Sequence, residues 1–185
     1  WNSIQGTIPL TETISTEINV LGDFAPEIPQ SWRSPNILFC ANTHPASQVM
    51  VLDQCPSSEI TAIDTFMLWI ETEFEDLSAA LRKADLAILN EEEVCAISGE
   101  EIFMKAIKPI LSGACLHGGE SAGLGPRGLV IKRGSSGVFA HLPCGIIALP
   151  SYPITEVIDP TGCGDSFAGA LLANMSGRKV GLQDL

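Results

Sequence analysis

The short apolar run at residues 86–89, Leu-Ala-Ile-Leu, constrains the fold of this chain more than any other segment. It shows no alternation of apolar and polar positions, and the polar residues that begin at Asn90 follow it directly. A strand with this pattern is buried on both faces, as in a parallel sheet that helices cover. The run therefore favours an α/β architecture with a mainly parallel sheet.

Other short apolar runs alternate with helical patterns along the chain, which is typical of repeated strand and helix units. The sequence predicts strands at residues 36–41, 59–63, 86–89, 128–132, 137–141 and 145–149, the last two as a hairpin. It predicts helices at residues 45–54, 73–83, 91–97, 101–111 and 165–175. We expect one α/β domain over residues 1–185, with the glycine-rich residues 112–128 as an inserted surface loop.

The composition is that of a soluble domain. Hydrophobic residues make up 45% of the chain and charged residues 17%, which is enough apolar material for one core of ordinary size. The net charge of −12 repels nucleic-acid backbones and anionic membrane surfaces. No apolar run is long enough to cross a bilayer, and the N-terminus lacks the pattern of a signal peptide. We therefore expect a cytoplasmic protein that binds neither nucleic acid nor membrane.

The cysteines and histidines give no sign of a metal site. The six cysteines include no Cys-x-x-Cys pair, and four of them lie within or beside apolar runs, so we expect buried, reduced thiols. His44, His117 and His141 lie far apart in the sequence, without the spacing of metal ligands.

Residues 158–170 combine a glycine turn with one carboxylate at the start of an apolar helix. Gly162 and Gly164 allow a tight turn whose N–H groups converge, and the helix dipole adds to them, so a phosphate is favoured there. Asp165 lies at the N-cap or in the first turn, where its carboxylate is stabilised in the ionised form that a general base needs. The simpler alternative is that Asp165 only caps the helix.

The stretch Asp-Pro-Thr-Gly-Cys-Gly-Asp at residues 159–165 resembles the second signature of the ribokinase-like carbohydrate kinases, the PfkB family. Only Cys163 departs from the family pattern, which has alanine there. The resemblance implies that Asp165 is the catalytic base and that the N–H groups of Gly162, Cys163 and Gly164 form the anion hole.

The resemblance also assigns a second role to this turn. It implies that the backbone around Asp159 and Thr161 binds a monovalent cation such as K⁺. The alternative is that these two side chains only shape the turn through hydrogen bonds to the backbone.

Two further segments resemble the family in the same order. Asn90 and Glu93 match its Asn-x-x-Glu element, which implies that they organise Mg²⁺ and phosphate, Glu93 mainly through water. Without the family, Glu93 would be read as a residue that complements the dipole of the following helix. Weaker likenesses lie at Asp64-Thr65 with Trp69, and at residues 148–153.

Residues 129–137 match the strand and glycine turn that borders the nucleotide in the family, which implies that Lys132, Gly134 and Gly137 bind the nucleotide. The residues themselves leave open whether Lys132 or Arg133 faces the phosphates, and both could belong to a solvated strand end.

The resemblance implies a three-layer α/β/α core, the central and C-terminal part of a ribokinase-like kinase, that is incomplete at both ends. The N-terminal Gly-Gly sugar-binding signature and the strands of the substrate lid are missing, and so are the elements after the last helix that wall the adenine in the family. The implied function is an ATP-dependent phosphotransferase that moves the γ-phosphoryl group to a hydroxyl of a sugar or nucleoside, with ATP and Mg²⁺ as cofactors. A homodimer is left open. The alternative function is a non-catalytic kinase remnant that acts as a nucleotide- or partner-binding module.

A third interpretation rests on Gly123-x-Gly125-x-x-Gly128, the glycine spacing of a dinucleotide fingerprint. That fingerprint must follow a strand and open a helix, whereas here it precedes a predicted strand and contains Pro126. A nicotinamide-dependent oxidoreductase is therefore disfavoured. The Gly-x-x-x-x-Gly-Lys-Ser/Thr pattern of a Walker-type nucleotide site is absent from the sequence.

Overall fold

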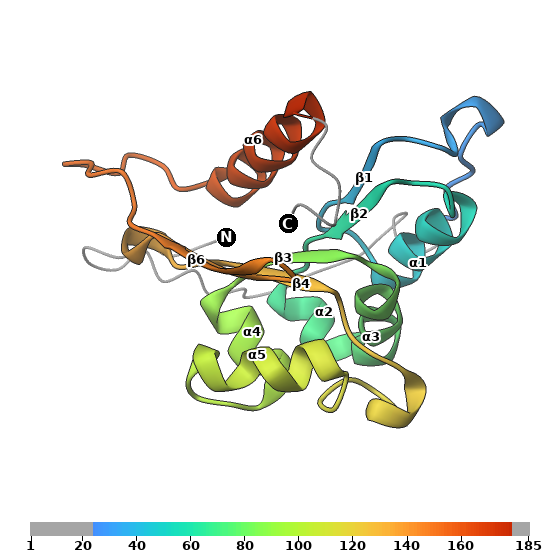
Figure 1. Cartoon of the computed structure of the whole chain (residues 1–185), viewed down its shortest axis with the longest axis horizontal. Coiled ribbons are helices and arrows are strands. Elements are labelled where there is room, and N and C mark those ends of the chain that lie inside the picture. Colours follow the sequence, from blue (N-terminus) through green and yellow to red (C-terminus); the bar gives the residue numbers. More distant parts are fainter. Residues whose placement is uncertain (1–23, 179–185) are drawn as a thin grey trace.

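The computed structural model describes residues 24–178, which contain one six-stranded, mainly parallel sheet (Figure 1). The strands lie side by side in chain order, and each of the first three is parallel to the next. The last two pairings are antiparallel, so the predicted hairpin is confirmed. The strands are β1 (Ile37–Cys40), β2 (Ile60–Ile63), β3 (Leu86–Asn90), β4 (Gly128–Lys132), β5 (Val138–Leu142) and β6 (Gly145–Leu149).

The helices cover the two faces of this sheet unequally. Crossovers between parallel strands are right-handed, so successive crossovers in one direction place their helices on the same face. Figure 1 shows α2 to α5 on one side of the sheet and α6 on the other, and α1 packs against α3. The helices are α1 (Pro45–Gln54), α2 (Met67–Thr72), α3 (Phe74–Lys83), α4 (Glu91–Ser98), α5 (Phe103–Ser112) and α6 (Cys163–Arg178).

Side chains alternate along the strands between two apolar clusters. In β3, Leu89 faces the cluster beneath α1 to α5, whereas Ile88 faces the cluster beneath α6. The larger cluster includes Leu81, Ile110 and Leu129, while α6 contributes Ala168, Leu172 and Met175 to the smaller one. Helices thus cover both faces of the sheet, and the expected three-layer α/β/α arrangement is confirmed.

The short helix α2 is the one helix that the sequence did not predict. It has only six residues, too few for a helical period to stand out, and its N-cap side chain makes no capping hydrogen bond. Trp69 and Ile70 are buried, and the indole N–H of Trp69 donates to the side-chain oxygen of Asn42 at 2.8 Å. Tertiary packing therefore holds this helix.

Most of the glycine-rich residues 112–128 form turns on the surface, with one 3-10 turn at Glu120–Ala122. The segment folds around the guanidinium of Arg82, which donates to the carbonyl oxygens of His117 and Gly119 at 3.0 Å each and also to that of Gly123. It leads into the amino end of β4, and no helix opens from its glycines, so the context of a dinucleotide fingerprint is absent there.

The cysteine prediction was wrong in part. All six thiols are free, but only Cys40 and Cys55 are buried, while Cys144 and Cys163 are exposed. Cys144 lies in the turn between β5 and β6, and Cys163 is the first residue of α6. Both therefore lie at the ends of elements, outside the two apolar clusters. Among residues 24–178, no helix combines the length and the apolar character needed to span a membrane.

Candidate active site

Two predicted site residues, Asn90 and Lys132, lie where parallel strands end, together with Asp64. Asp64 follows β2, Asn90 ends β3 and Lys132 ends β4, so all three lie at the carboxyl edge of the sheet, where α/β proteins bind ligands. A cleft of about 540 Å³ opens beside this edge. Its walls come from the strand ends, the turn after β4, residues 150–152 and the first turn of α6. They are Asn90, Lys132, Arg133, Gly134, Gly137, Val138, Pro150, Ser151, Tyr152, Cys163, Gly164 and Phe167.

The turn before α6 has the geometry of an anion site. Gly162 has φ 75°, a left-handed conformation that favours glycine. The N–H of Cys163 donates to the carbonyl of Pro160 at 3.1 Å, whereas the described backbone hydrogen bonds leave the N–H groups of Gly164 and Asp165 free. Free amides in the first turn and the positive end of the helix dipole favour an anion.

Asp165 lies in the first turn of α6 and is exposed, on the side of the strand ends. Its charge contributes to the raised pKa of Asp64, so the two carboxylates lie within each other's field. The role of Asp165 as the general base stays a prediction.

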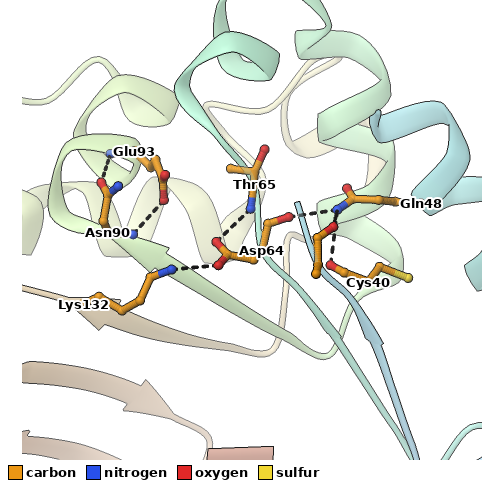
Figure 2. A network of polar contacts seen from close by, with 8 residues as sticks. Cys40, Gln48, Asp64, Thr65, Asn90, Glu93 and Lys132 are labelled. Carbon is orange, nitrogen blue, oxygen red and sulfur yellow. Dashed lines mark hydrogen bonds and ion pairs between the residues drawn. The ribbon is translucent and has the colours of Figure 1, made fainter. Parts of the chain in front are cut away.

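Lys132 forms a largely buried ion pair with Asp64, the two atoms Nζ and Oδ2 lying 2.7 Å apart (Figure 2). The side chains are only 18% and 6% exposed. Burial raises the pKa of Asp64, while the hydrogen bond and charge of Lys132 oppose that change. A Cβ added at Gly164 would lie 3.2 Å from Nζ, so the absence of a side chain there lets the ammonium approach the start of α6.

Arg133 has a different environment from its neighbour. Its Nε donates to the carboxylate of Glu91 at 2.7 Å, and its guanidinium lies 4.5 Å from the centre of the Phe103 ring. The sequence left open which of the two cations faces the phosphates. The structure places Lys132 against the start of α6 and ties Arg133 to α4 and α5.

Asn90 and Glu93 form a capping box at the start of α4 (Figure 2). The side-chain oxygen of Asn90 accepts the N–H of Glu93 at 2.8 Å, and Glu93 Oε2 accepts the N–H of Asn90 at 2.7 Å. Burial raises the pKa of Glu93 to about 7. The helix-start alternative therefore describes what these side chains do in the structure. Their role toward Mg²⁺ stays a prediction.

The oxygen atoms around Asn90 and Glu93 suit a magnesium ion that keeps most of its waters better than an ion coordinated by protein side chains alone. Within residues 24–176, no three His, Cys, Asp or Glu side chains come together as metal ligands. Mg²⁺ prefers oxygen ligands and keeps several waters, and the oxygens present here are the amide oxygen of Asn90, which lines the cleft, and the carboxylate of its neighbour Glu93.

Two further glycines shape the cleft. Gly137 has φ 90°, and a Cβ there would overlap the carbonyl oxygen of Leu149, so only glycine fits. Gly134 has φ 53° and opens the turn after β4. The hydroxyl of Ser151 donates to the carbonyl of Ser135 at 2.7 Å and joins this turn to the segment after β6.

Asp159 and Thr161 shape the turn before α6. The N–H of Thr161 donates to Asp159 Oδ1 at 2.8 Å, and hydrogen bonds from Thr161 lower the pKa of Asp159. Both residues are exposed. The turn-shaping alternative is thus observed, while binding of a monovalent cation stays a prediction.

Comparisons with known proteins agree with this geometry. A family model described as pfkB family carbohydrate kinase matches residues 52–179. The chain is 28% identical over 155 residues to a cytidine kinase of Thermococcus kodakarensis, a match that covers 80% of this chain and 51% of that protein.

Solved structures show the same fold. A putative ribokinase II from E. coli in its apo form superposes with a TM-score of 0.62 at 20% identity, over 80% of this chain and 48% of that one. Arabidopsis thaliana ribokinase complexed with ribose and ATP gives 0.59 at 22% identity, over 76% and 43%. The ribokinase-like fold class is therefore confirmed, and the chain spans about half the length of the relatives it matches.

Proposed function

The chain belongs to the pfkB family of carbohydrate kinases, and on that premise we propose that it transfers the γ-phosphoryl group of ATP to a hydroxyl of a sugar or nucleoside. The observation that supports the proposal is the approach of the Lys132 ammonium to Gly164 in the first turn of α6, the turn that carries Asp165, beside one cleft at the carboxyl edge of the sheet.

Asp165 acts as the general base. Its carboxylate accepts the proton of the acceptor hydroxyl as that oxygen attacks the γ-phosphorus. The N–H groups of Gly162, Cys163 and Gly164 form the anion hole for the charge on the transferred group. Since the N–H of Cys163 donates to Pro160, the amide of Gly164, which the described backbone hydrogen bonds leave free, is the donor most readily available to the phosphoryl group.

The nucleotide lies along the turn after β4. Lys132 contributes the positive charge, and Gly134 and Gly137 let the backbone approach the phosphates closely. Asn90 and Glu93 would hold hydrated Mg²⁺, which neutralises phosphate charge when it is bound. The backbone around Asp159 and Thr161 would take K⁺. Support for ATP and Mg²⁺ comes from a related putative ribokinase II from E. coli, solved in complex with both.

The Asp165→Asn variant tests the role of the base. Asparagine keeps a side chain that can cap the helix but cannot take a proton, so kcat should fall about 10²-fold or more with little loss of stability. Asp76→Asn is the matched control, because Asp76 also lies in the first turn of a helix and is not among the residues that line the cleft. Turnover is measured on a panel of sugars and nucleosides.

The same panel separates the kinase from a nucleotide- or partner-binding remnant. Calorimetry with ATP is run beside the turnover assay on the wild-type protein. Binding of ATP without transfer to any acceptor supports the remnant, and full turnover by Asp165→Asn contradicts the role of the base.

A further inference from the structure

The ion pair between Asp64 and Lys132 is not explained by its contribution to stability. Taking both charges out of water is costly, and apolar residues of similar volume are often as stable as a buried ion pair. Burial accordingly raises the pKa of Asp64. The charge of Asp165 acts in the same direction. Since the ion pair is kept in spite of these costs, we expect it to serve a function at the carboxyl edge of the sheet.

Asp64 is fixed in its position by its neighbours. The N–H of Thr65 donates to Oδ1 of Asp64 at 2.9 Å, and the side-chain amide of Gln48 donates to its backbone carbonyl at 2.8 Å (Figure 2). The same Gln48 amide also donates to the carbonyl of Ala41 at 2.9 Å, so β1 and the end of β2 are held together. Asp64 thus offers Oδ2 to Lys132 from a rigid support.

Lys132 stands where an anion would be most strongly attracted. Its Nζ lies beside Gly164 in the first turn of α6, whose free amides and helix dipole carry positive charge toward the same point. An ammonium has three N–H donors, and the described contacts use one of them, on Asp64. The other two can bind phosphoryl oxygens while the pair with Asp64 is kept.

We propose that Asp64 is a positioning residue that holds the Lys132 ammonium at the start of α6, where this ammonium binds the oxygens of the phosphoryl group in transfer. The inference rests on the proposed kinase function. It assigns a role to Asp64, a residue to which the proposed function gives no role. Asp64 touches neither substrate. It acts through Lys132, and it keeps that side chain from turning toward solvent when no phosphate is bound.

The test is a double-mutant cycle in the full chain, with Asp64→Asn, Lys132→Met and both changes together. Each protein is measured for kcat, for KM of the acceptor and for the Kd of ATP. Lys132→Met should lower kcat about 10²-fold and Asp64→Asn about 10-fold, and the double variant should be no worse than Lys132→Met alone. KM of the acceptor should change less than about 2-fold in each variant, because the pair acts on the phosphoryl group.

Asp85→Asn is the matched control for the loss of a partly buried carboxylate. Asp85 lies just before β3, at the opposite edge of the sheet, where it accepts the N–H and the hydroxyl of Thr61 at 2.9 Å each. Its loss should lower stability without changing kcat. If Asp64→Asn does not fold, Asp64→Glu takes its place, since the longer side chain keeps the charge but displaces the ammonium.

The outcomes distinguish this proposal from the kinase proposal. The positioning role would be overturned if the double variant lost kcat by the product of the two single losses, or if Asp64→Asn kept full turnover. Either result would leave the kinase proposal intact. If the wild type binds ATP without turnover, the kinase proposal fails, and the Kd of ATP tests the positioning role instead. That role is supported if each single variant binds ATP more weakly than the wild type and the double variant binds it no more weakly than Lys132→Met alone. A wild type without any ATP binding would overturn both.

Discussion

The two faces of the sheet differ in how they are covered. The face beneath α1 to α5 carries the larger cluster of buried side chains, built by helices that follow their strands through short connections. The opposite face has α6 alone among residues 24–178, and α6 arrives after the exposed segment at residues 152–162. Asp165, the proposed base, and the proposed anion site belong to this second, thinly packed face.

The strands also differ in exposure between the edge and the centre of the sheet. In β6 every residue is exposed, and Ile146 and Leu149 are 60% and 56% accessible, whereas Leu89 in β3 is fully buried. We therefore expect stability to come mainly from the face beneath α1 to α5, while the proposed site depends on how α6 packs on the other face. The following substitutions test that division.

The largest effect is expected for Leu89→Ala in the larger cluster. Leu89 is fully buried between β3 and the helices, so the substitution leaves a cavity and should lower the free energy of unfolding by about 4 kcal/mol. Denaturant titration measures the change. At a temperature where the variant stays folded, kcat should be close to that of the wild type. A large loss of kcat would contradict the proposed separation between the face that supplies stability and the face that carries the site.

A smaller effect is expected for Glu93→Gln, which lies where α4 meets the site. Folding raises the pKa of Glu93 from 4.5 to about 7, so the folded state favours the protonated form. Its ionisation destabilises the protein as pH rises from 4.5 through about 7, and this penalty is absent at lower pH.

Glutamine removes the charge but can still accept the N–H of Asn90. Above pH 7 the variant should be more stable than the wild type by up to about 3 kcal/mol, and at pH 4.5 the two should be nearly equal. Thermal unfolding across this range measures the difference. Equal pH profiles would show that Glu93 ionises in the folded protein as readily as in the unfolded chain.

The smallest effect on stability is expected for Leu172→Ala, the counterpart of Leu89→Ala on the other face. Leu172 is 5% exposed and belongs to the smaller cluster, so the loss should be about 2 kcal/mol. Because α6 carries Asp165 at its first turn, kcat should nevertheless fall further than in Leu89→Ala. A larger stability loss in Leu172→Ala than in Leu89→Ala would reverse the comparison.

Much of the fold could be predicted from the sequence, because apolar runs and turn residues mark the elements locally. The predicted bounds of α1, β4 and β6 agree with the structure to the residue. Helix α2 was missed because burial of Trp69 holds it, and a short segment shows no period. The exposure of Cys163 could not be seen either, since it depends on what covers the start of α6.

The site was predicted only in part, for a similar reason. The glycine turn and Asp165 stand together in the sequence, so local chemistry and the family resemblance identify them. The choice between Lys132 and Arg133 depends on partners far along the chain, Asp64 for one and Phe103 for the other. Asp64 carried only a weak signal, a weaker likeness of Asp64-Thr65 with Trp69 to the family, and its importance depends on the ion pair with Lys132.

The strand order has a consequence for how the chain forms on the ribosome. Since β1 to β6 lie side by side in the order of synthesis, each new strand can pair with the one made just before it. The scaffold of five helices can therefore assemble progressively during translation. Helix α6 is made after all six strands, so the turn that carries Asp165 joins a platform that already exists.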